Sequence, residues 1–239
     1  MKIGFLGAGK MAHGILAAVK NPRGVLLSDI ERNRNVEIAK KCDLIFLAVR
    51  PQDVDAVAAE VRPFLHRGQT LVSIVAGKTL AKLKSAFGAK AKIIRVMPNL
   101  CLRAGEGMCA MTAKDERVAA ILNGAGKTVV LKEKDFDAVT ALSGSGPAYF
   151  AYMEQAMMEG GIALGLKSAV ARLLAEQTMY GTAKFLRESK MDLDDFIGGV
   201  CTKGGTTAAG MVELDKGGIL KSLVRKTLAA AAARSRALA

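Results

Sequence analysis

The first fourteen residues, MKIGFLGAGKMAHG, place a short apolar stretch directly before a glycine-rich turn and a helix-forming segment. This order predicts a strand over 3–6, a tight turn over 7–9 and a helix that begins near Lys10. A second apolar stretch at 25–29 predicts the next strand. Strand, glycine turn, helix and strand in this order are typical of a dinucleotide-binding unit, and they constrain the fold more than any other part of the chain.

Each residue type in the turn has a physical role in such a unit. Gly7 allows the chain to turn tightly out of the strand, Gly9 leaves room for a pyrophosphate, and Ala12 lets the helix lie close to the sheet. The helix begins at Lys10 and Met11, so its free N–H groups and the positive end of its dipole would face the phosphates. We therefore predict that these five residues bind the cofactor. A strand-to-helix turn without a ligand is the alternative interpretation.

Composition places the chain among globular proteins. About half of the 239 residues are apolar, which is enough for one large or two modest cores. No apolar run approaches the roughly 20 residues that a membrane span needs. Met1-Lys2 leads straight into the first strand, unlike a signal peptide. The four cysteines lack metal-ligand spacing, which predicts free thiols and no metal site. We expect a cytoplasmic protein without a membrane partner.

The formal net charge of +13 raises the question of an anionic partner. The lysines and arginines are dispersed, and the chain has no Trp and three Tyr, so a platform on which bases could stack is missing. This pattern disfavours a nucleic-acid partner. We interpret the charge as a source of solubility and as an attraction for a phosphorylated cofactor and a carboxylate substrate.

Strand and helix signals alternate through the first half of the chain, and helical patterns fill the second half. The fold class predicted is α/β: a Rossmann-like dinucleotide-binding domain over 1–134, followed by an all-helical domain over 135–239. Predicted strands in the first domain are 3–6, 25–29, 43–49, 70–75, 91–97, 107–111 and 127–131. The helices predicted in the second domain are 146–164, 167–189, 193–200, 205–214 and 219–238. Their Met-rich and Ala-rich faces predict pairing with at least one more copy of the chain.

One connection is unusually short. Only thirteen residues, 30–42, separate the second strand from the third, and 36–41 must already form a helix. A usual unit has another helix and another strand at this place. Either the sheet lacks that edge strand or a segment is missing from the chain. A right-handed crossover needs only about a dozen residues, so the short connection can be built, although the adenosine end of a cofactor would lose part of its wall.

Three further motifs follow in order: Val96-Met97-Pro98-Asn99, Ser143-Gly144-Ser145-Gly146-Pro147-Ala148-Tyr149 and Gly204-Gly205-Thr206-Thr207. With them the chain resembles the pyrroline-5-carboxylate reductase family from Met1 to about residue 238. The resemblance implies hydride transfer from a reduced nicotinamide cofactor to the imine carbon of Δ1-pyrroline-5-carboxylate, which gives L-proline in the last step of its biosynthesis. Such a reaction asks the protein for a bound cofactor, a carboxylate anchor and a hydrogen-bonding group near the ring nitrogen.

The Gly-Gly-Thr-Thr motif suits the substrate. Two glycines at a helix start expose consecutive N–H groups that bind anions, and both threonine hydroxyls stand in the first turn. The resemblance places Thr207 at the ring nitrogen as the catalytic residue, with Thr202, Gly204, Gly205 and Thr206 around the carboxylate. A helix start with two capping threonines is the alternative. Lys203 stands where the family commonly has Pro, so the conformation of this loop is open.

The remaining candidates follow strand ends. The segment from Ser143 to Pro147 is predicted to be a loop, and the resemblance implies that Ser143 and Ser145 line the cleft for nicotinamide and substrate; a plain turn and cap is the alternative. Cofactor contacts are also predicted for two segments, with Met97 equally able to sit in the core. These are Ala48, Val49, Arg50 and Pro51, and Met97, Pro98 and Asn99.

The choice of cofactor depends on the second strand end. Asp29 would bond a ribose 2′-hydroxyl and repel a 2′-phosphate. Ser28, Arg32 and Arg34 favour a 2′-phosphate, because a hydroxyl and guanidinium groups can hold it. The resemblance favours NADPH, with NADH as the alternative.

Two other functions compete with this one. A β-hydroxyacid dehydrogenase would need a lysine a few residues after its central glycine motif, yet no Lys follows Gly146 until Lys167. A non-catalytic dinucleotide-binding protein would keep the fold and lose the chemistry, and the short segment after Asp29 is its main support.

Overall fold

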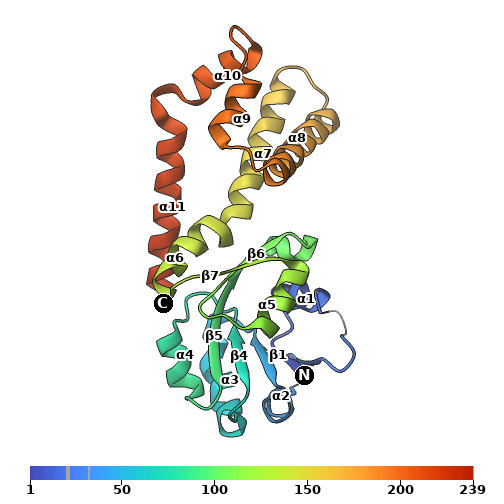
Figure 1. Ribbon diagram of the computed structural model, residues 1–239, viewed down its shortest axis with the longest axis vertical. Coiled ribbons are helices and arrows are strands. Elements are labelled where there is room, and N and C mark those ends of the chain that lie inside the picture. The colour runs from blue at the N-terminus through green and yellow to red at the C-terminus, as the bar shows by residue number, and fades with distance from the viewer. Residues whose placement is uncertain (20–21, 32, 239) are drawn as a thin grey trace. The chain divides into compact units, whose positions relative to one another are not determined.

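The structure is a computed structural model that describes residues 1–19, 22–31 and 33–238 (Figure 1). It divides the chain into two compact units. The first unit contains residues 1–147 together with the residues from Leu228 onward, and the second contains Ala148–Thr227.

One sheet of seven strands forms the centre of the first unit within the described residues, in the order β2-β1-β3-β4-β5-β6-β7. Neighbouring strands from β2 to β5 are parallel, β6 runs antiparallel to β5, and β7 is parallel to β6. The strands are β1 (Ile3–Leu6), β2 (Leu26–Ser28), β3 (Leu44–Leu47), β4 (Thr70–Ser73), β5 (Lys92–Pro98), β6 (Gly107–Met111) and β7 (Gly126–Val130). The predicted mainly parallel sheet is confirmed.

Helices cover both faces of this sheet (Figure 1). On one face α1 (Lys10–Ala17) and α5 (Glu116–Leu122) share a buried core with β1, β3 and β5. On the other face α2 (Asn35–Lys41), α3 (Val54–Val61) and α4 (Leu80–Phe87) pack on the opposite side chains of the same strands. Phe5 and Phe46 stack inside the first core, with ring centroids 4.8 Å apart. Each such buried side chain contributes about 1.5–3 kcal/mol to folding.

The short connection after β2 forms α2 and no further strand within the described residues, an arrangement that either of its two alternatives gives. β2 is the edge strand of the sheet, and α2 begins at Asn35, only a few residues after β2 ends at Ser28. The chain then crosses β1 to reach β3. Among the described residues, no further strand lies beyond β2.

Asp115 caps helix α5. Its carboxylate accepts hydrogen bonds from the backbone N–H groups of Arg117 and Val118, from Lys92 Nζ at 3.1 Å and from Arg117 Nη2 at 3.1 Å. The Asp115 side chain is 6% exposed. Burial alone would raise the pKa of this carboxyl, but the hydrogen bonds from Arg117, Lys92 and Val118 outweigh burial and lower the pKa to about 2.

We expect Asp115→Ala to lower the free energy of unfolding by about 1–2 kcal/mol at neutral pH, since it removes both a cap and a carboxylate with two cationic partners. The folded-state pKa is depressed, so the stabilisation is complete above the ordinary carboxyl pKa and is lost as the pH falls toward about 2. Urea unfolding across this pH range measures it, with Glu116→Gln as the control because that side chain is 79% exposed. A difference between Asp115→Ala and the natural chain that stays constant down to the lowest pH would contradict the account.

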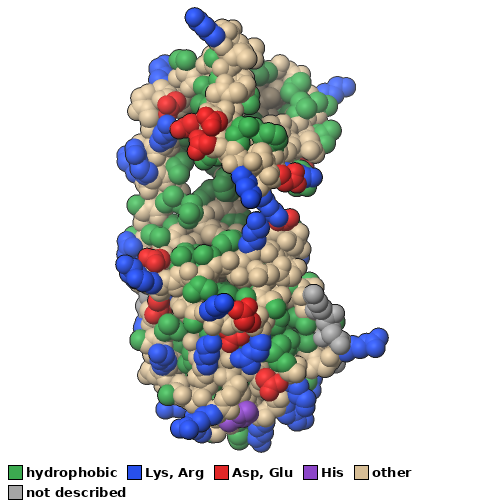
Figure 2. Space-filling view, viewed as in Figure 1, with side chains coloured by type: hydrophobic (Ala, Val, Ile, Leu, Met, Phe, Trp, Pro, Cys, Tyr) green, Lys and Arg blue, Asp and Glu red, His purple; other side chains and the backbone are tan. Residues whose placement is uncertain are grey.

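The second half of the chain is helical, as predicted, and much of its apolar surface is exposed. Its helices are α7 (Gly146–Ala163), α8 (Ser168–Ser189), α9 (Leu193–Val200), α10 (Thr206–Leu214) and α11 (Ile219–Leu238). Phe150, Tyr152, Leu173 and Val212 are each between 65% and 75% exposed. Figure 2 shows Lys and Arg side chains scattered over the visible face among Asp and Glu. A second copy of the chain would cover the exposed apolar side chains.

The described residues contain neither a membrane-spanning helix nor a metal-binding cluster. No helix there is both long and apolar enough to span a bilayer. No group of three or more His, Cys, Asp or Glu side chains in the same residues could hold a metal ion. All four cysteines are free, and burial raises the pKa of Cys109 to about 12.

Candidate active site

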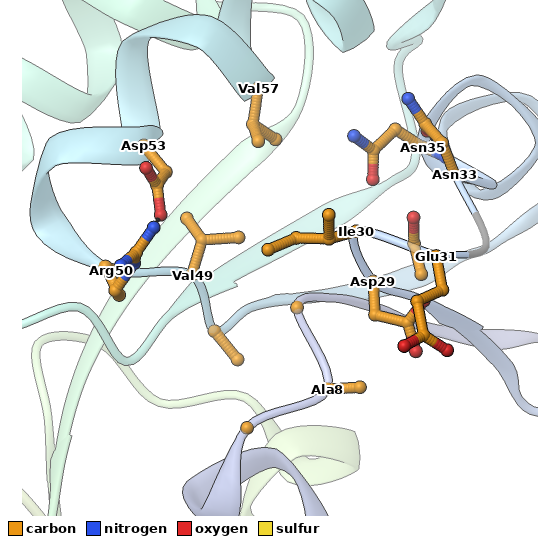
Figure 3. Close-up of a pocket in the computed structure, with 14 residues that line it drawn as sticks. Ala8, Asp29, Ile30, Glu31, Asn33, Asn35, Val49, Arg50, Asp53 and Val57 are labelled. Carbon is orange, nitrogen blue, oxygen red and sulfur yellow. Dashed lines mark hydrogen bonds and ion pairs between the residues drawn. The ribbon is translucent and has the colours of Figure 1, made fainter.

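A cavity of about 710 Å³ opens at the carboxyl ends of β1, β2 and β3 (Figure 3). It is lined by seven residues that the sequence singles out and by seven that it does not. The first group is Gly7, Gly9, Ser28, Asp29, Ala48, Val49 and Arg50, and the second is Ala8, Ile30, Glu31, Asn33, Asn35, Asp53 and Val57. The carboxyl edge of a parallel sheet is where open α/β folds bind ligands.

The two glycines of the first turn have different surroundings. Gly7 has φ +99°, and a Cβ built there would lie 2.6 Å from the carbonyl oxygen of Ala48, so no side chain fits. Gly9 has φ −73°, and a Cβ there would meet nothing within 4 Å. Gly7 is therefore required by the fold itself. Gly9 is required only by something that fills the cavity.

The N-terminus of α1 stands beside Gly9 without a capping side chain. Its first N–H groups are thus available to an anion in the cavity. Lys10 is exposed, and the side chain of Met11 packs against the core of the first unit. Ala12 is 1% exposed and lies in the same core, where its small side chain lets α1 approach the sheet.

Among the described residues that line the cavity, acidic side chains outnumber cations. Arg50 Nε pairs with Asp53 Oδ2 at 2.9 Å, and both lie on the opposite side from Asp29 and Glu31 in Figure 3. Ile30 is 95% exposed and points toward Val49. Pro51 begins the short helical turn after Arg50 and is not a lining residue.

The segment after β2 bears on the cofactor's 2′ position. The Ser28 hydroxyl accepts a hydrogen bond from the backbone N–H of Arg34 at 2.9 Å. The Arg34 guanidinium pairs with Glu37 at 2.8 Å, and hydrogen bonds from Arg34 and Lys41 lower the pKa of Glu37 to about 2. Arg32, the other predicted cation, lies outside the described residues.

Two motifs far apart in the sequence meet beside the end of β5. Asn99 Nδ2 lies 3.4 Å from the Ser143 hydroxyl, while Asn99 Oδ1 accepts the Met108 N–H at 3.1 Å. Met97 is 6% exposed in a core with Phe136, and a Cβ at Gly144 would lie 3.6 Å from its sulfur. Pro98 ends β5. The structure therefore brings together Met97, Asn99 and Ser143.

The predicted Pro in a first helical turn is confirmed, but the prediction of a loop before it was wrong at Ser143 and Gly144. Thr140–Gly144 forms a π-helix that follows α6 (Phe136–Val139), and the Ser145 N–H closes it on the Thr140 carbonyl at 2.8 Å. Pro147 is the second residue of α7, where its missing N–H costs nothing. Single-turn π-helices often occur at functional sites, because the extra residue redirects side chains.

The Gly-Gly-Thr-Thr motif starts helix α10 in the second unit. Gly204 has φ +73°, and the Gly205 N–H donates to the Thr202 carbonyl at 2.9 Å. Gly205 is the N-cap residue and carries no capping side chain, so Thr206 and Thr207 occupy the first two helical positions instead of capping the helix. Thr207 is half-buried, and Thr202 and Thr206 are exposed. This arrangement leaves the first N–H groups of α10 available to a carboxylate.

Comparison with known proteins places the chain in a family. It is 36% identical to the pyrroline-5-carboxylate reductase of Arabidopsis thaliana, with 99% of this chain and 95% of that protein covered. The chain belongs to the pyrroline-5-carboxylate reductase family. The alignment spans 264 positions, more than the 239 residues of this chain, so the Arabidopsis protein holds residues that this family member lacks.

Solved structures and family models agree with this membership. Pyrroline carboxylate reductase of Plasmodium falciparum, solved with NADP bound, covers 100% of the chain with a TM-score of 0.88 and 30% identity. The enzyme of Coxiella burnetii has a TM-score of 0.92 over 99% of the chain, with 26% identity. Residues 133–238 match the model for pyrroline-5-carboxylate reductase dimerisation, and 17–77 match one described as NADP oxidoreductase, coenzyme F420-dependent.

Proposed function

We propose that this chain reduces Δ1-pyrroline-5-carboxylate to L-proline with NADPH, the last step of proline biosynthesis. The observation that carries the proposal is the cavity at the carboxyl edge of β1 and β3, where Gly9 faces open space beside the uncapped N-terminus of α1, in a member of this family. The free N–H groups of α1 suit a pyrophosphate. NADPH, when bound, supplies the hydride.

The protein contributes binding and orientation on the cofactor side. Ile30 and Val49 offer apolar contact to an adenine ring, and Asn99 and Ser143 offer polar groups to the nicotinamide end. The Ser28 hydroxyl and Arg32 are the proposed contacts of the 2′-phosphate, as suits a relative solved with NADP bound. Asp29 and Glu31 oppose this preference by charge. We propose NADPH as the preferred cofactor.

This preference predicts a ratio of rates. A charge-assisted contact to the 2′-phosphate is worth about 1.5–3 kcal/mol, so kcat/KM with NADPH should exceed that with NADH about 10- to 100-fold. Steady-state kinetics with each cofactor measure the ratio. Equal rates, or faster turnover with NADH, would contradict the proposal and show that repulsion by Asp29 and Glu31 outweighs the contacts to the 2′-phosphate.

The substrate contacts proposed are those of the α10 start. The N–H groups of Gly204 and Thr206 hold the substrate carboxylate, with the Thr202 and Thr206 hydroxyls near it, while the Gly205 N–H stays bonded to the Thr202 carbonyl. Thr207 hydrogen-bonds the ring nitrogen, whose positive charge disappears as the imine carbon accepts hydride. No side chain needs to act as a strong base, because the protonated imine is already electrophilic.

We further propose a dimer as the smallest active unit and the cytoplasm as its compartment. The match of 133–238 to a dimerisation model and the exposed apolar side chains of α7 to α11 support the dimer. Four free cysteines suit a reducing compartment.

The test of the function is to mix the chain with Δ1-pyrroline-5-carboxylate and NADPH and to follow the absorbance of the reduced nicotinamide. We expect oxidation that depends on both reactants and yields L-proline. Binding of NADPH without turnover would instead favour the non-catalytic dinucleotide-binding protein. Measuring NADPH binding beside turnover therefore separates a loss of chemistry from a loss of the cofactor site.

A further inference from the structure

The last turns of α11 return to the first unit and are held there at two points. Ser235 is 6% exposed, and its hydroxyl donates a hydrogen bond to Asp137 Oδ1 at 2.7 Å, across 98 positions of sequence. Gly77 has φ +71°, and a Cβ built there would lie 2.8 Å from the Leu238 carbonyl oxygen. A hydroxyl bonded to a carboxylate at this distance is a strong, charge-assisted contact.

Asp137 is the second residue of α6, directly before the π-helix that carries Ser143. The Thr140 hydroxyl donates to the Phe136 carbonyl at 2.7 Å, and the Ser145 N–H donates to the Thr140 carbonyl at 2.8 Å. The segment 136–145 is thus continuously hydrogen-bonded. A tilt or rotation at Asp137 would be transmitted to Ser143 and Gly144, which face Asn99 and Met97.

The other attachment of α6 is apolar. Phe136 is 1% exposed, and the guanidinium of Arg95 lies 4.9 Å from the centre of its ring. Arg95 is itself buried and pairs with Glu133 at 3.2 Å. Val139, at the end of α6, packs against the same core. The hydrogen bond from Ser235 adds a polar attachment at Asp137 to these apolar ones.

We propose that Ser235 and Asp137 are positioning residues for the reaction: the hydrogen bond between them holds the π-helix Thr140–Gly144 in register with Met97 and Asn99. Neither residue touches the reactants. The catalytic part of this inference rests on the proposed function, because its consequence for turnover requires that Ser143 and Asn99 serve the nicotinamide end. The effect on the backbone does not depend on that function.

The experiment compares Ser235→Ala, Asp137→Ala, the double variant and Ser235→Thr, which keeps the hydroxyl. Ser85→Ala is the matched control, because Ser85 is an exposed helical serine on α4 in the same unit. Steady-state kinetics, the deuterium isotope effect on hydride transfer and the urea midpoint are measured for each chain. Hydrogen exchange of the amides over 136–145 gives a readout that needs no turnover.

We expect kcat to fall about 3- to 30-fold in Ser235→Ala and in Asp137→Ala, with a larger isotope effect. The double variant should fall no further than either single one, and Ser235→Thr should recover most of the rate. Amides over 140–145 should exchange faster in the three disrupted chains while those of α4 stay protected. This pattern at an unchanged urea midpoint would support positioning.

The proposal is overturned by unchanged exchange over 140–145, by losses in the single variants that multiply in the double, or by an equal loss in Ser85→Ala. A rate loss that follows the urea midpoint across the variants also overturns it, since that is the behaviour of a purely structural contact. If the natural chain shows no turnover, the proposed function fails, and the exchange measurement alone decides whether Ser235 orients the π-helix.

Discussion

Thr207→Ala is expected to lower kcat/KM about 30- to 1000-fold while costing only about 1 kcal/mol of folding free energy. The side chain is half-buried in the first turn of α10, and Gly205, not a threonine, occupies the cap position. Removing its hydroxyl therefore removes the proposed partner of the ring nitrogen and leaves the N–H groups of Gly204 and Thr206 for the carboxylate. Losing a hydrogen bond at a reacting centre typically costs about 2–4 kcal/mol.

Kinetics and urea unfolding on the same protein preparations test this expectation. Thr207→Ser keeps a hydroxyl and should keep most of the activity. Thr227→Ala is the matched control, because that hydroxyl donates to the Leu223 carbonyl at 3.0 Å along an exposed helix. If Thr207→Ala has the kcat/KM of the natural chain, or loses activity only in proportion to its unfolding, Thr207 has a structural role at the start of α10 and no catalytic one.

Gly9→Val is expected to fold normally and to lose at least about 100-fold in NADPH affinity, or about 2.8 kcal/mol. The backbone at Gly9 suits any residue, and a Cβ there meets no protein atom within 4 Å. A valine side chain would instead occupy the cavity space proposed for the pyrophosphate. Fluorescence titration with NADPH measures the affinity, and circular dichroism and thermal unfolding report on the fold.

Gly7→Val provides the opposite case two residues away. At φ +99° an L side chain is strained, and its Cβ would lie 2.6 Å from the backbone of Ala48, so this variant should lose several kcal/mol of stability. Gly7→Val should thus mainly lower the free energy of unfolding, whereas Gly9→Val should mainly lower the NADPH affinity. If a folded Gly9→Val variant keeps the NADPH affinity of the natural chain, the pyrophosphate does not bind at this turn.

Much of the fold could be predicted because hydrophobic patterning reports it directly. β1, β6, α9 and α11 have the predicted bounds, since each is an apolar run or a helical pattern with clear ends. Helix α5 was not predicted, although Asp115 followed by Glu116 is a recognisable helix start. The π-helix over 140–144 could not be predicted, because Ser and Gly are typical of turns and because its side-chain contact, that of Ser143 with Asn99, joins segments far apart in the sequence.

In the candidate site, too, some residues could be predicted from local sequence and others could not. The spacing of Gly7 and Gly9 is visible in the sequence. The cavity wall formed by Ile30, Glu31, Asn33 and Asn35 arises only because α2 follows β2 so closely. The pairing of Arg50 with Asp53 is a property of the turn after β3 and is visible only in three dimensions. The contact of Asn99 with Ser143 joins segments 44 positions apart, and periodicity carries no information about such pairs.

The central claim is that this chain delivers hydride from reduced nicotinamide to the imine carbon of Δ1-pyrroline-5-carboxylate. Turnover with NADPH deuterated at nicotinamide C4 tests it most directly, because the label follows the transferred atom. The account predicts L-proline that carries deuterium at the former imine carbon when the labelled face is the one used. Proline without deuterium from either labelled face, or consumption of NADPH without proline, would contradict it.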